Sequence, residues 1–175
     1  MKILVLGVPF AGKTYLSAYM TNCGYNAFDG DYIVGLSKFI TRDGKDVTHA
    51  VQTGTYKSRR IANRVWQLDF LKEYLNDQPD SIIIFGWAAN ITDTFSLFDK
   101  VFYLGLTQEE LAHRFEHNER EHNYGRTASE QLRIKTAHKK WLDTARHRNI
   151  PVINATAPPV HIENILKKHC KLGNY

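Results

Sequence analysis

The feature that most constrains this chain is a glycine-containing stretch near its start. It reads Gly7-Val8-Pro9-Phe10-Ala11-Gly12-Lys13-Thr14. An apolar run at residues 3–6, typical of a buried strand, precedes it, and a helical pattern at 13–22 follows, with Gly24 placed to end the helix. The stretch matches G-x-x-x-x-G-K-[ST] without a departure, and it lies between a strand and a helix as that motif requires.

Each part of this loop has a physical role. The two glycines allow a tight turn in which successive backbone N–H groups converge on phosphate oxygens, and the helix that follows adds the positive end of its dipole. We expect Lys13 to bridge the β- and γ-phosphates and the Thr14 hydroxyl to reach Mg²⁺. All eight residues are therefore predicted to bind a nucleoside triphosphate.

Along the rest of the chain, apolar runs alternate with helical patterns. The strand candidates are residues 3–6, 26–28, 81–85, 101–104 and 151–153. The spacing of apolar residues predicts a helix over 61–75, capping boxes at Thr107 and Thr127 predict two more, and a last helix follows Pro158. This alternation predicts an α/β fold, an open parallel sheet with helices on both faces, in a single domain spanning 1–175. Ligands of such sheets gather at the carboxyl ends of the strands.

Composition excludes several classes of protein. A hydrophobic fraction of 43% with 23% charged residues is average for a soluble globular chain, and no apolar run is long enough for a membrane span or a signal peptide. The net charge of +5 comes from scattered lysines and arginines, so nucleic acid is not an expected partner. Cys23 and Cys170 are too few for a disulfide framework, which favours a reducing compartment and a cytoplasmic protein.

The second predicted strand ends in two acids, Asp29 and Asp31, separated by Gly30. At a strand terminus facing the phosphates, one carboxylate could hold Mg²⁺ through water, and the other could orient or deprotonate an acceptor hydroxyl. The alternative is a turn with two solvated carboxylates. The third strand ends without an acid, and no N-K-x-D motif follows, so a kinase is favoured over a motor or a GTPase switch.

Three arginines, Arg114, Arg120 and Arg126, recur every six residues in a polar connection between two predicted helices. Phosphoryl transfer needs cations around the transferred group and exclusion of water, and a mobile arginine-bearing lid with a hinge at Gly125 would supply both. The alternative is that these arginines pair with nearby glutamates on a helix surface.

With these motifs, the chain resembles the P-loop small-molecule and nucleoside monophosphate kinase superfamily, in particular its adenylate kinase-like and shikimate kinase-like members. The resemblance rests on the loop at 7–14, on Asp29-Gly30-Asp31, on the arginines from Arg120 to Arg126, and on residues 153–156 after the last strand. It implies a five-stranded sheet in the order 2-3-1-4-5, a lid at about 116–128 and an acceptor-binding segment at about 34–60.

The resemblance also implies roles for single residues. Asp29 becomes the acid beside Mg²⁺ and Asp31 the acceptor contact, while Arg120 and Arg126 become the lid arginines. The loop at 154–158, with Asn154 and Thr156, becomes the adenine contact, and Arg114 lies beside the adenine.

The end of the third strand departs from this family. Nucleoside monophosphate kinases usually carry Asp-Gly-x-Pro-Arg there and shikimate kinases a glycine triplet, whereas this chain has Gly86-Trp87-Ala88-Ala89-Asn90. Trp87 by stacking and Asn90 by hydrogen bonding are candidate acceptor contacts, although Trp87 fits core packing equally well. Arg59 is a further candidate, because an arginine fork suits a carboxylate or a phosphate. The histidines show no metal-ligand spacing, so zinc is not expected.

The sequence therefore predicts an ATP-dependent kinase that uses Mg²⁺ and acts on a small acceptor such as a nucleoside, a nucleotide or a hydroxy acid. The expected catalytic residues are Lys13, Asp31, Arg120 and Arg126, and the expected metal ligands are Thr14 and Asp29. The alternative hypothesis is a nucleotide-binding regulatory or assembly protein with slow hydrolysis and no small acceptor. The acceptor, the preferred triphosphate and the choice between monomer and homodimer stay open.

Overall fold

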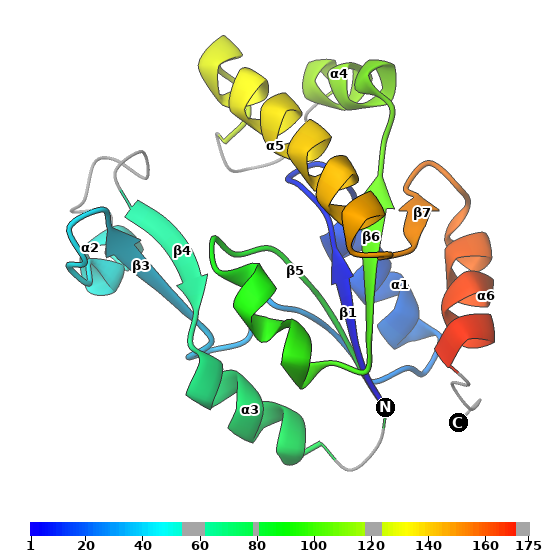
Figure 1. The fold of residues 1–175 in the computed structure, drawn as a ribbon. Coiled ribbons are helices and arrows are strands. Elements are labelled where there is room, and N and C mark those ends of the chain that lie inside the picture. The colour runs from blue at the N-terminus through cyan, green and yellow to red at the C-terminus, as the bar shows by residue number, and fades with distance from the viewer. Residues whose placement is uncertain (54–61, 79–80, 118–123, 171–175) are drawn as a thin grey trace.

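A computed structural model of the chain describes residues 1–53, 62–78, 81–117 and 124–170 (Figure 1). Its main sheet is parallel and has the strand order β2-β5-β1-β6-β7. The strands are β1 (Lys2–Leu6), β2 (Ala27–Asp29), β5 (Ile82–Gly86), β6 (Lys100–Gly105) and β7 (Val152–Asn154). Counted without the two strands outside this sheet, the order is 2-3-1-4-5. The predicted α/β fold with a five-stranded parallel sheet is therefore confirmed.

Helices cover both faces of this sheet (Figure 1). One face packs against α1 (Lys13–Asn22), α4 (Gln108–Glu116) and α6 (Pro159–Cys170), and the other against α3 (Leu68–Asn76), the 3₁₀ helix η1 (Ile91–Leu97) and the end of α5 (Ala128–His147). Alternate residues of β1 serve the two cores, Ile3 and Val5 on one side and Leu4 and Leu6 on the other. Burial on both faces explains why the strand sequences are continuous apolar runs.

The helix expected over 61–75 is wrong in its first half. Residues Ala62–Trp66 form a strand, β4, which pairs antiparallel with β3 (Ser37–Thr41), and only α3 is helical. A short helix, α2 (Thr48–Gln52), follows β3. Apolar spacing over 61–75 imitates a helical period, but the hydrogen bonds of β4 go to a strand far away in sequence, which local periodicity does not reveal. Figure 1 shows this hairpin beside the main sheet, on the side of β5 and α3.

The helix boundaries that depend on local signals agree with the sequence analysis. α1 spans the predicted residues, and the side chain of Thr107 accepts a hydrogen bond from the Glu110 N–H at the start of α4. Thr127 and Glu130 form the complete capping box predicted at the start of α5. These ends are fixed by contacts within three or four residues, which is why the sequence alone predicts them.

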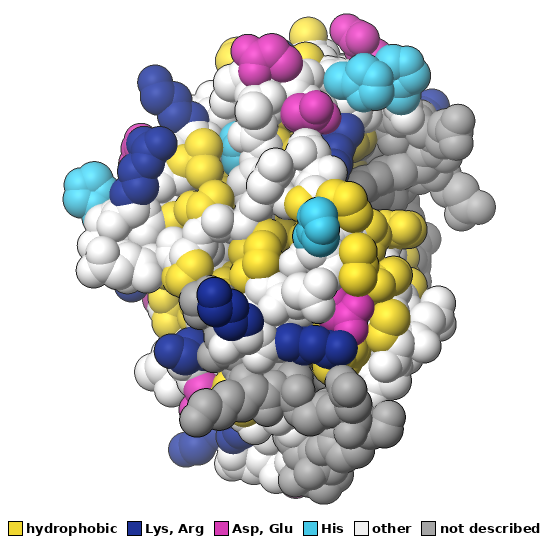
Figure 2. Space-filling model, turned by 90° about the vertical axis from the view of Figure 1, so that its right-hand side faces the viewer, with side chains coloured by type: hydrophobic (Ala, Val, Ile, Leu, Met, Phe, Trp, Pro, Cys, Tyr) yellow, Lys and Arg dark blue, Asp and Glu magenta, His cyan; other side chains and the backbone are white. Residues whose placement is uncertain are grey.

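The surface agrees with the charge pattern of the sequence. On the face shown in Figure 2, lysines and arginines stand in several separate places among acidic and neutral side chains. Among the helices that the structure describes, none combines the length and the apolar character needed to cross a bilayer.

Candidate active site

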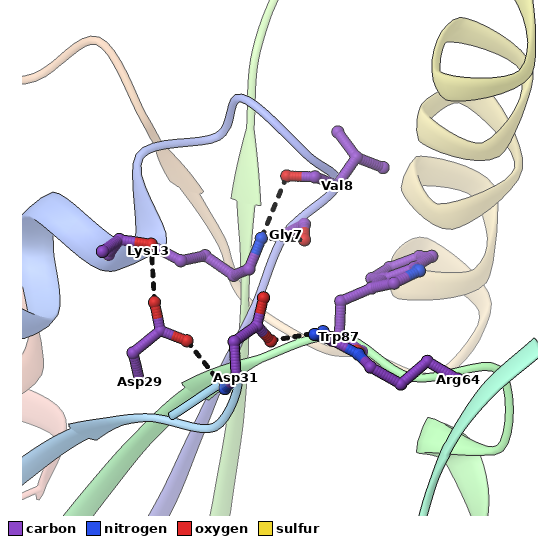
Figure 3. A network of polar contacts seen from close by, with 8 residues as sticks. Gly7, Val8, Lys13, Asp29, Asp31, Arg64 and Trp87 are labelled. Atoms are coloured by element: carbon purple, nitrogen blue, oxygen red, sulfur yellow. Dashed lines mark hydrogen bonds and ion pairs between the residues drawn. The ribbon is translucent and has the colours of Figure 1, made fainter. Parts of the chain in front are cut away.

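The phosphate loop connects the carboxyl end of β1 to the start of α1, as predicted. The Lys13 side chain is 9% exposed, and its ammonium group donates hydrogen bonds to the carbonyl oxygens of Gly7, at 2.8 Å, and Val8, at 3.2 Å. Figure 3 shows the ammonium held over the loop by these carbonyls. A second contact inside the loop joins the Ala11 N–H to the Val8 carbonyl at 3.1 Å. The single lysine of the motif is thus already directed at the space that the loop encloses.

The two motif glycines are needed for different reasons. Gly12, which precedes α1, has a φ of +91° in the left-handed region that favours glycine. The φ of Gly7 lies outside that region, but a Cβ there would come within 2.8 Å of the Ala11 Cβ and 3.2 Å of the Leu104 Cβ. Gly12 therefore permits the turn, whereas Gly7 permits close packing of the loop against β6.

Thr14 and Asp29, the predicted metal ligands, lie side by side. The Thr14 hydroxyl donates to the Asp29 carboxylate at 2.6 Å, and the other carboxylate oxygen accepts a hydrogen bond from the Asp31 N–H at 2.9 Å. Asp29 is 8% exposed, and none of the ion pairs found among the described residues involves it. Hydroxyl and carboxylate oxygens are the donors that Mg²⁺ prefers, so this pair fits a magnesium site.

Asp31 forms an ion pair with Arg64, a residue of β4 that the sequence analysis did not select (Figure 3). The same guanidinium nitrogen donates to the Trp87 carbonyl at 2.8 Å, and the Ala89 N–H donates to the Arg64 carbonyl at 2.8 Å. Arg64 therefore joins the end of β2 to the loop after β5. A helix over 61–75 with its apolar residues turned inward would leave Arg64 on the solvent side, which is why the pattern offered no reason to select it. Val65 and Trp66, one β-branched and one aromatic, are the residues that could have indicated a strand here.

Asn90, a predicted acceptor contact, makes two hydrogen bonds to the backbone of Trp66. Its side-chain oxygen accepts from the Trp66 N–H and its side-chain nitrogen donates to the Trp66 carbonyl, both at 2.9 Å. The Trp66 indole is 1% exposed and fills the space beside Gly30 and Gly86, where a Cβ would come within 2.5 and 2.2 Å of it. Asn90 and the two glycines therefore fix β4 against the site.

Trp87 packs with the core. Its ring is half-buried, meets the Trp141 ring edge-on at a centroid distance of 5.0 Å, and contacts both hydrophobic clusters. Its backbone carbonyl, rather than its ring, makes the polar contact with Arg64. Of the two interpretations that the sequence left open for Trp87, core packing has the direct structural support.

Arg114 joins the phosphate loop to the loop that was predicted to contact adenine. Its two terminal nitrogens donate to the carbonyls of Phe10, at 2.7 Å, and Ala155, at 2.9 Å. Burial lowers the pKa of the Arg114 guanidinium from its ordinary value, and the nearby Glu110 opposes this. Arg114 therefore sets the distance between these two loops.

A hollow of about 370 Å³ lies between these two loops. It is lined by Ala11, Gly12, Tyr15, Leu16, Arg114, Ala155, Thr156, Ala157, Pro158, Pro159 and Ile162. Thr156 is part of this lining, whereas the Asn154 side chain accepts hydrogen bonds from the Thr156 N–H and hydroxyl at 3.0 and 2.8 Å. Asn154 thus braces the loop that carries Thr156.

The predicted lid is described only at its two ends. Arg126 is exposed, and Arg59 and Arg120 lie outside the described residues. Gly125 is buried, its N–H donates to the Glu130 carboxylate at 3.2 Å, and its carbonyl accepts from the Gln131 amide at 3.1 Å. The expected hinge is therefore fixed to the first turn of α5 in this structure.

Comparison with known proteins adds a fold but no close relative. No protein-family model and no curated protein sequence matches the chain. Among solved structures, it is similar to a deoxyadenosine kinase from M. mycoides with bound dATP, with a TM-score of 0.50 and 17% identity over 97% of this chain and 99% of that one. A shikimate kinase from Aquifex aeolicus VF5 gives a TM-score of 0.45 and 12% identity over 99% and 100% of the two chains. The strand order and the likeness to the deoxyadenosine kinase show that the chain has a P-loop kinase-like α/β fold with a five-stranded parallel sheet.

Proposed function

We propose that this protein is an ATP-dependent phosphotransferase that uses Mg²⁺ and acts on a small-molecule acceptor. The observation that carries the proposal is the position of two carboxylates, each held by a partner side chain, beside one phosphate loop. Thr14 contacts Asp29. Asp31 contacts Arg64, and the Lys13 ammonium binds carbonyls of the same loop (Figure 3). A phosphate-binding loop with a second, separately anchored carboxylate at its mouth favours transfer to an acceptor over simple hydrolysis.

The donor side would hold ATP through the loop at residues 7–14. Backbone N–H groups would surround the phosphates, and the Lys13 ammonium would exchange its contacts with the loop carbonyls for phosphate oxygens. The hollow beside Arg114 and Thr156 has apolar walls, as a purine ring requires, and it opens next to Gly12 at the start of α1. This placement supports an adenine nucleotide whose phosphates extend towards Lys13.

Thr14 and Asp29 would hold Mg²⁺, which when bound supplies positive charge to the phosphates. Thr14 is an exposed residue at the start of α1, and the Asp29 carboxylate is buried and held in place by the Asp31 N–H. Two oxygen donors are thus positioned before any ion arrives, which lowers the entropic cost of binding.

On the acceptor side, Asp31 would accept the hydrogen of the attacking hydroxyl and Arg64 would hold Asp31 in position. The Arg64 guanidinium has further donors that suit an acceptor with a carboxylate or phosphate group. Arg126, at the described end of the predicted lid, would stabilise the charge of the transferred phosphoryl group, and Arg120 would act with it. Lys13, Asp31, Arg120 and Arg126 are the proposed catalytic residues.

The likeness to a deoxyadenosine kinase makes nucleosides the first class of acceptor to test, followed by nucleotides, sugar acids and hydroxy acids. Purified protein is incubated with ATP and Mg²⁺, and release of ADP is followed by a coupled assay as each acceptor is added. We expect ADP formation that is stoichiometric with one acceptor, and phosphorylated acceptor visible by mass spectrometry. Hydrolysis that ignores every acceptor and rises only with a macromolecule would support a regulatory or assembly protein instead.

A matched pair of lysine variants separates the loop's chemistry from its folding. Lys13→Met removes the ammonium that faces the loop, whereas Lys139→Met removes an exposed charge on α5. We expect Lys13→Met to reduce turnover at least about 100-fold, because it removes a charge that acts directly on the phosphates, and Lys139→Met to leave it unchanged. Thermal unfolding of both variants should stay close to that of the wild type.

A further inference from the structure

Phe10 has an uncommon conformation for a residue in the middle of the phosphate loop. Its φ is +74°, in the left-handed region that bulky side chains rarely adopt. Its ring is nevertheless buried, with an exposed fraction of 4%, and meets the Phe115 ring of α4 edge-on at a centroid distance of 4.9 Å. Its carbonyl accepts the hydrogen bond from Arg114 at 2.7 Å. A strained loop residue that is fixed at both its ring and its carbonyl is a candidate for a functional constraint.

Gly125 lies directly against the same ring. A Cβ at position 125 would come within 2.4 Å of Cε2 and 2.5 Å of Cζ of Phe10. No Cβ approaches a heavy atom so closely, so the Phe10 ring can occupy its present place only because residue 125 has no side chain. The two residues are far apart in sequence and belong to the phosphate loop and to the end of the predicted lid.

Gly125 is in turn attached to α5. Its N–H and carbonyl are bonded to the side chains of Glu130 and Gln131, and Glu130 also closes the capping box with Thr127. A continuous series of contacts therefore runs from the first turn of α5, through Gly125, to the ring of Phe10 and the backbone of the phosphate loop. Arg126 follows Gly125 immediately.

We propose that the Phe10–Gly125 contact couples the phosphate loop to the segment that carries Arg126. The Phe10 side chain is attached to the Cα whose φ and ψ orient the next peptide, so a displaced ring disturbs the loop backbone around Ala11, whose N–H is bonded to the Val8 carbonyl. Phe10 is thus a positioning residue, and Gly125 is the position that sets where its ring lies. The inference rests on the proposed function, because the loop must bind phosphates for the contact to matter.

Two alanine substitutions at glycines isolate this contact. Gly125 and Gly44 have nearly the same φ, +90° and +86°, so alanine introduces the same backbone strain at both. At Gly44 a Cβ would meet nothing within 4 Å, whereas at Gly125 it collides with the Phe10 ring. We expect Gly125→Ala to raise the Kd for ADP about tenfold, the size of a moderate overpacking penalty, and Gly44→Ala to leave it within about twofold.

A second substitution tests whether the collision is the cause. Leucine lacks the two ring atoms that the new Cβ would meet, so Phe10→Leu combined with Gly125→Ala should recover most of the ADP affinity that Gly125→Ala loses. Thermal unfolding is measured on every variant, because a merely structural collision would lower the melting temperature of Gly125→Ala while leaving its ADP affinity equal to that of Gly44→Ala.

Hydrogen exchange supplies a further test, in which the wild type is compared with Phe10→Leu. ADP should slow exchange of the backbone amides at 124–127 in the wild type and leave them unaffected in Phe10→Leu. If Gly125→Ala binds ADP as tightly as Gly44→Ala does, or if ADP leaves these amides unchanged in the wild type, the coupling is wrong while the proposed function stands. If the wild type binds no ADP, the proposed function itself fails.

Discussion

Arg64 of β4 is ion-paired with Asp31 at the end of β2, so a hairpin outside the main sheet supplies a charge to the mouth of the phosphate loop. Further hydrogen bonds fix the strand that carries Arg64. Arg64 also binds the Trp87 carbonyl, its own carbonyl accepts from Ala89, and Asn90 fixes the following Trp66. The site is thus built between the carboxyl edge of the parallel sheet and a separate antiparallel pair of strands.

Replacing Arg64 by glutamine should reduce activity on the acceptor without weakening ATP binding. The substitution removes a charge-assisted hydrogen bond to Asp31, a loss of about 1.5–3 kcal/mol, so kcat/KM for the acceptor should fall roughly 10- to 100-fold. Steady-state kinetics with each substrate varied in turn would measure this. Arg146→Gln, which removes an exposed arginine paired with Asp143 of the same helix, is the control, and an equal loss in both variants would refute the assignment.

Asp29→Asn should change the dependence on Mg²⁺ more than the fold. The amide retains an oxygen for one of the two hydrogen bonds that Asp29 accepts, but it lacks the charge that binds a divalent ion. We expect the Mg²⁺ concentration for half-maximal activity to rise at least about tenfold, since carboxylate charge dominates affinity for hard cations. A titration of activity against Mg²⁺ tests this, with Asp77→Asn, an exposed residue after α3, as the control. An unchanged Mg²⁺ requirement would exclude Asp29 as a ligand.

The substitution Asn90→Ala distinguishes a structural role of Asn90 from a role in binding the acceptor. If it fixes β4, Asn90→Ala removes both hydrogen bonds to Trp66 and leaves two backbone groups without these partners, which should cost about 2–4 kcal/mol of unfolding free energy. If it contacts the acceptor, KM should rise while stability stays the same. We expect the first result, measured by urea unfolding, with the exposed Asn164→Ala as the control.

The stability of the protein should fall in alkaline solution partly through Tyr19. A hydrogen bond to Cys23, burial and the Glu163 carboxylate, in that order, raise the pKa of Tyr19 to about 12 from its ordinary value of 10.0. Because the folded state keeps the proton more tightly than the unfolded state, this contribution is complete below pH 10 and is lost as the pH rises towards 12. Unfolding free energies measured across this range should therefore fall more steeply for the wild type than for Tyr19→Phe, and parallel curves would contradict the assignment.

The features that the sequence determined by itself are those that depend on neighbouring residues. The phosphate loop, the strand ends that carry Asp29 and Asp31, and the caps at Thr107 and Thr127 each depend on residues within a few positions of one another. A contiguous motif has little conformational freedom, so its residues and its structure can be predicted together. The parallel sheet also followed from sequence, since buried strands need apolar residues on both faces.

The tertiary structure decided what depends on residues distant in the chain. Arg64 reaches Asp31 only because β4 pairs with β3, and the Asn90 amide bonds the Trp66 backbone, a contact that no local pattern indicates. Likewise, nothing local to Gly125 shows that the Phe10 ring needs its empty space. A local pattern fixes the conformation of a few neighbouring residues. Contacts between remote segments depend on the packing of the whole chain. That packing brings Arg64 to Asp31 and the Phe10 ring to Gly125.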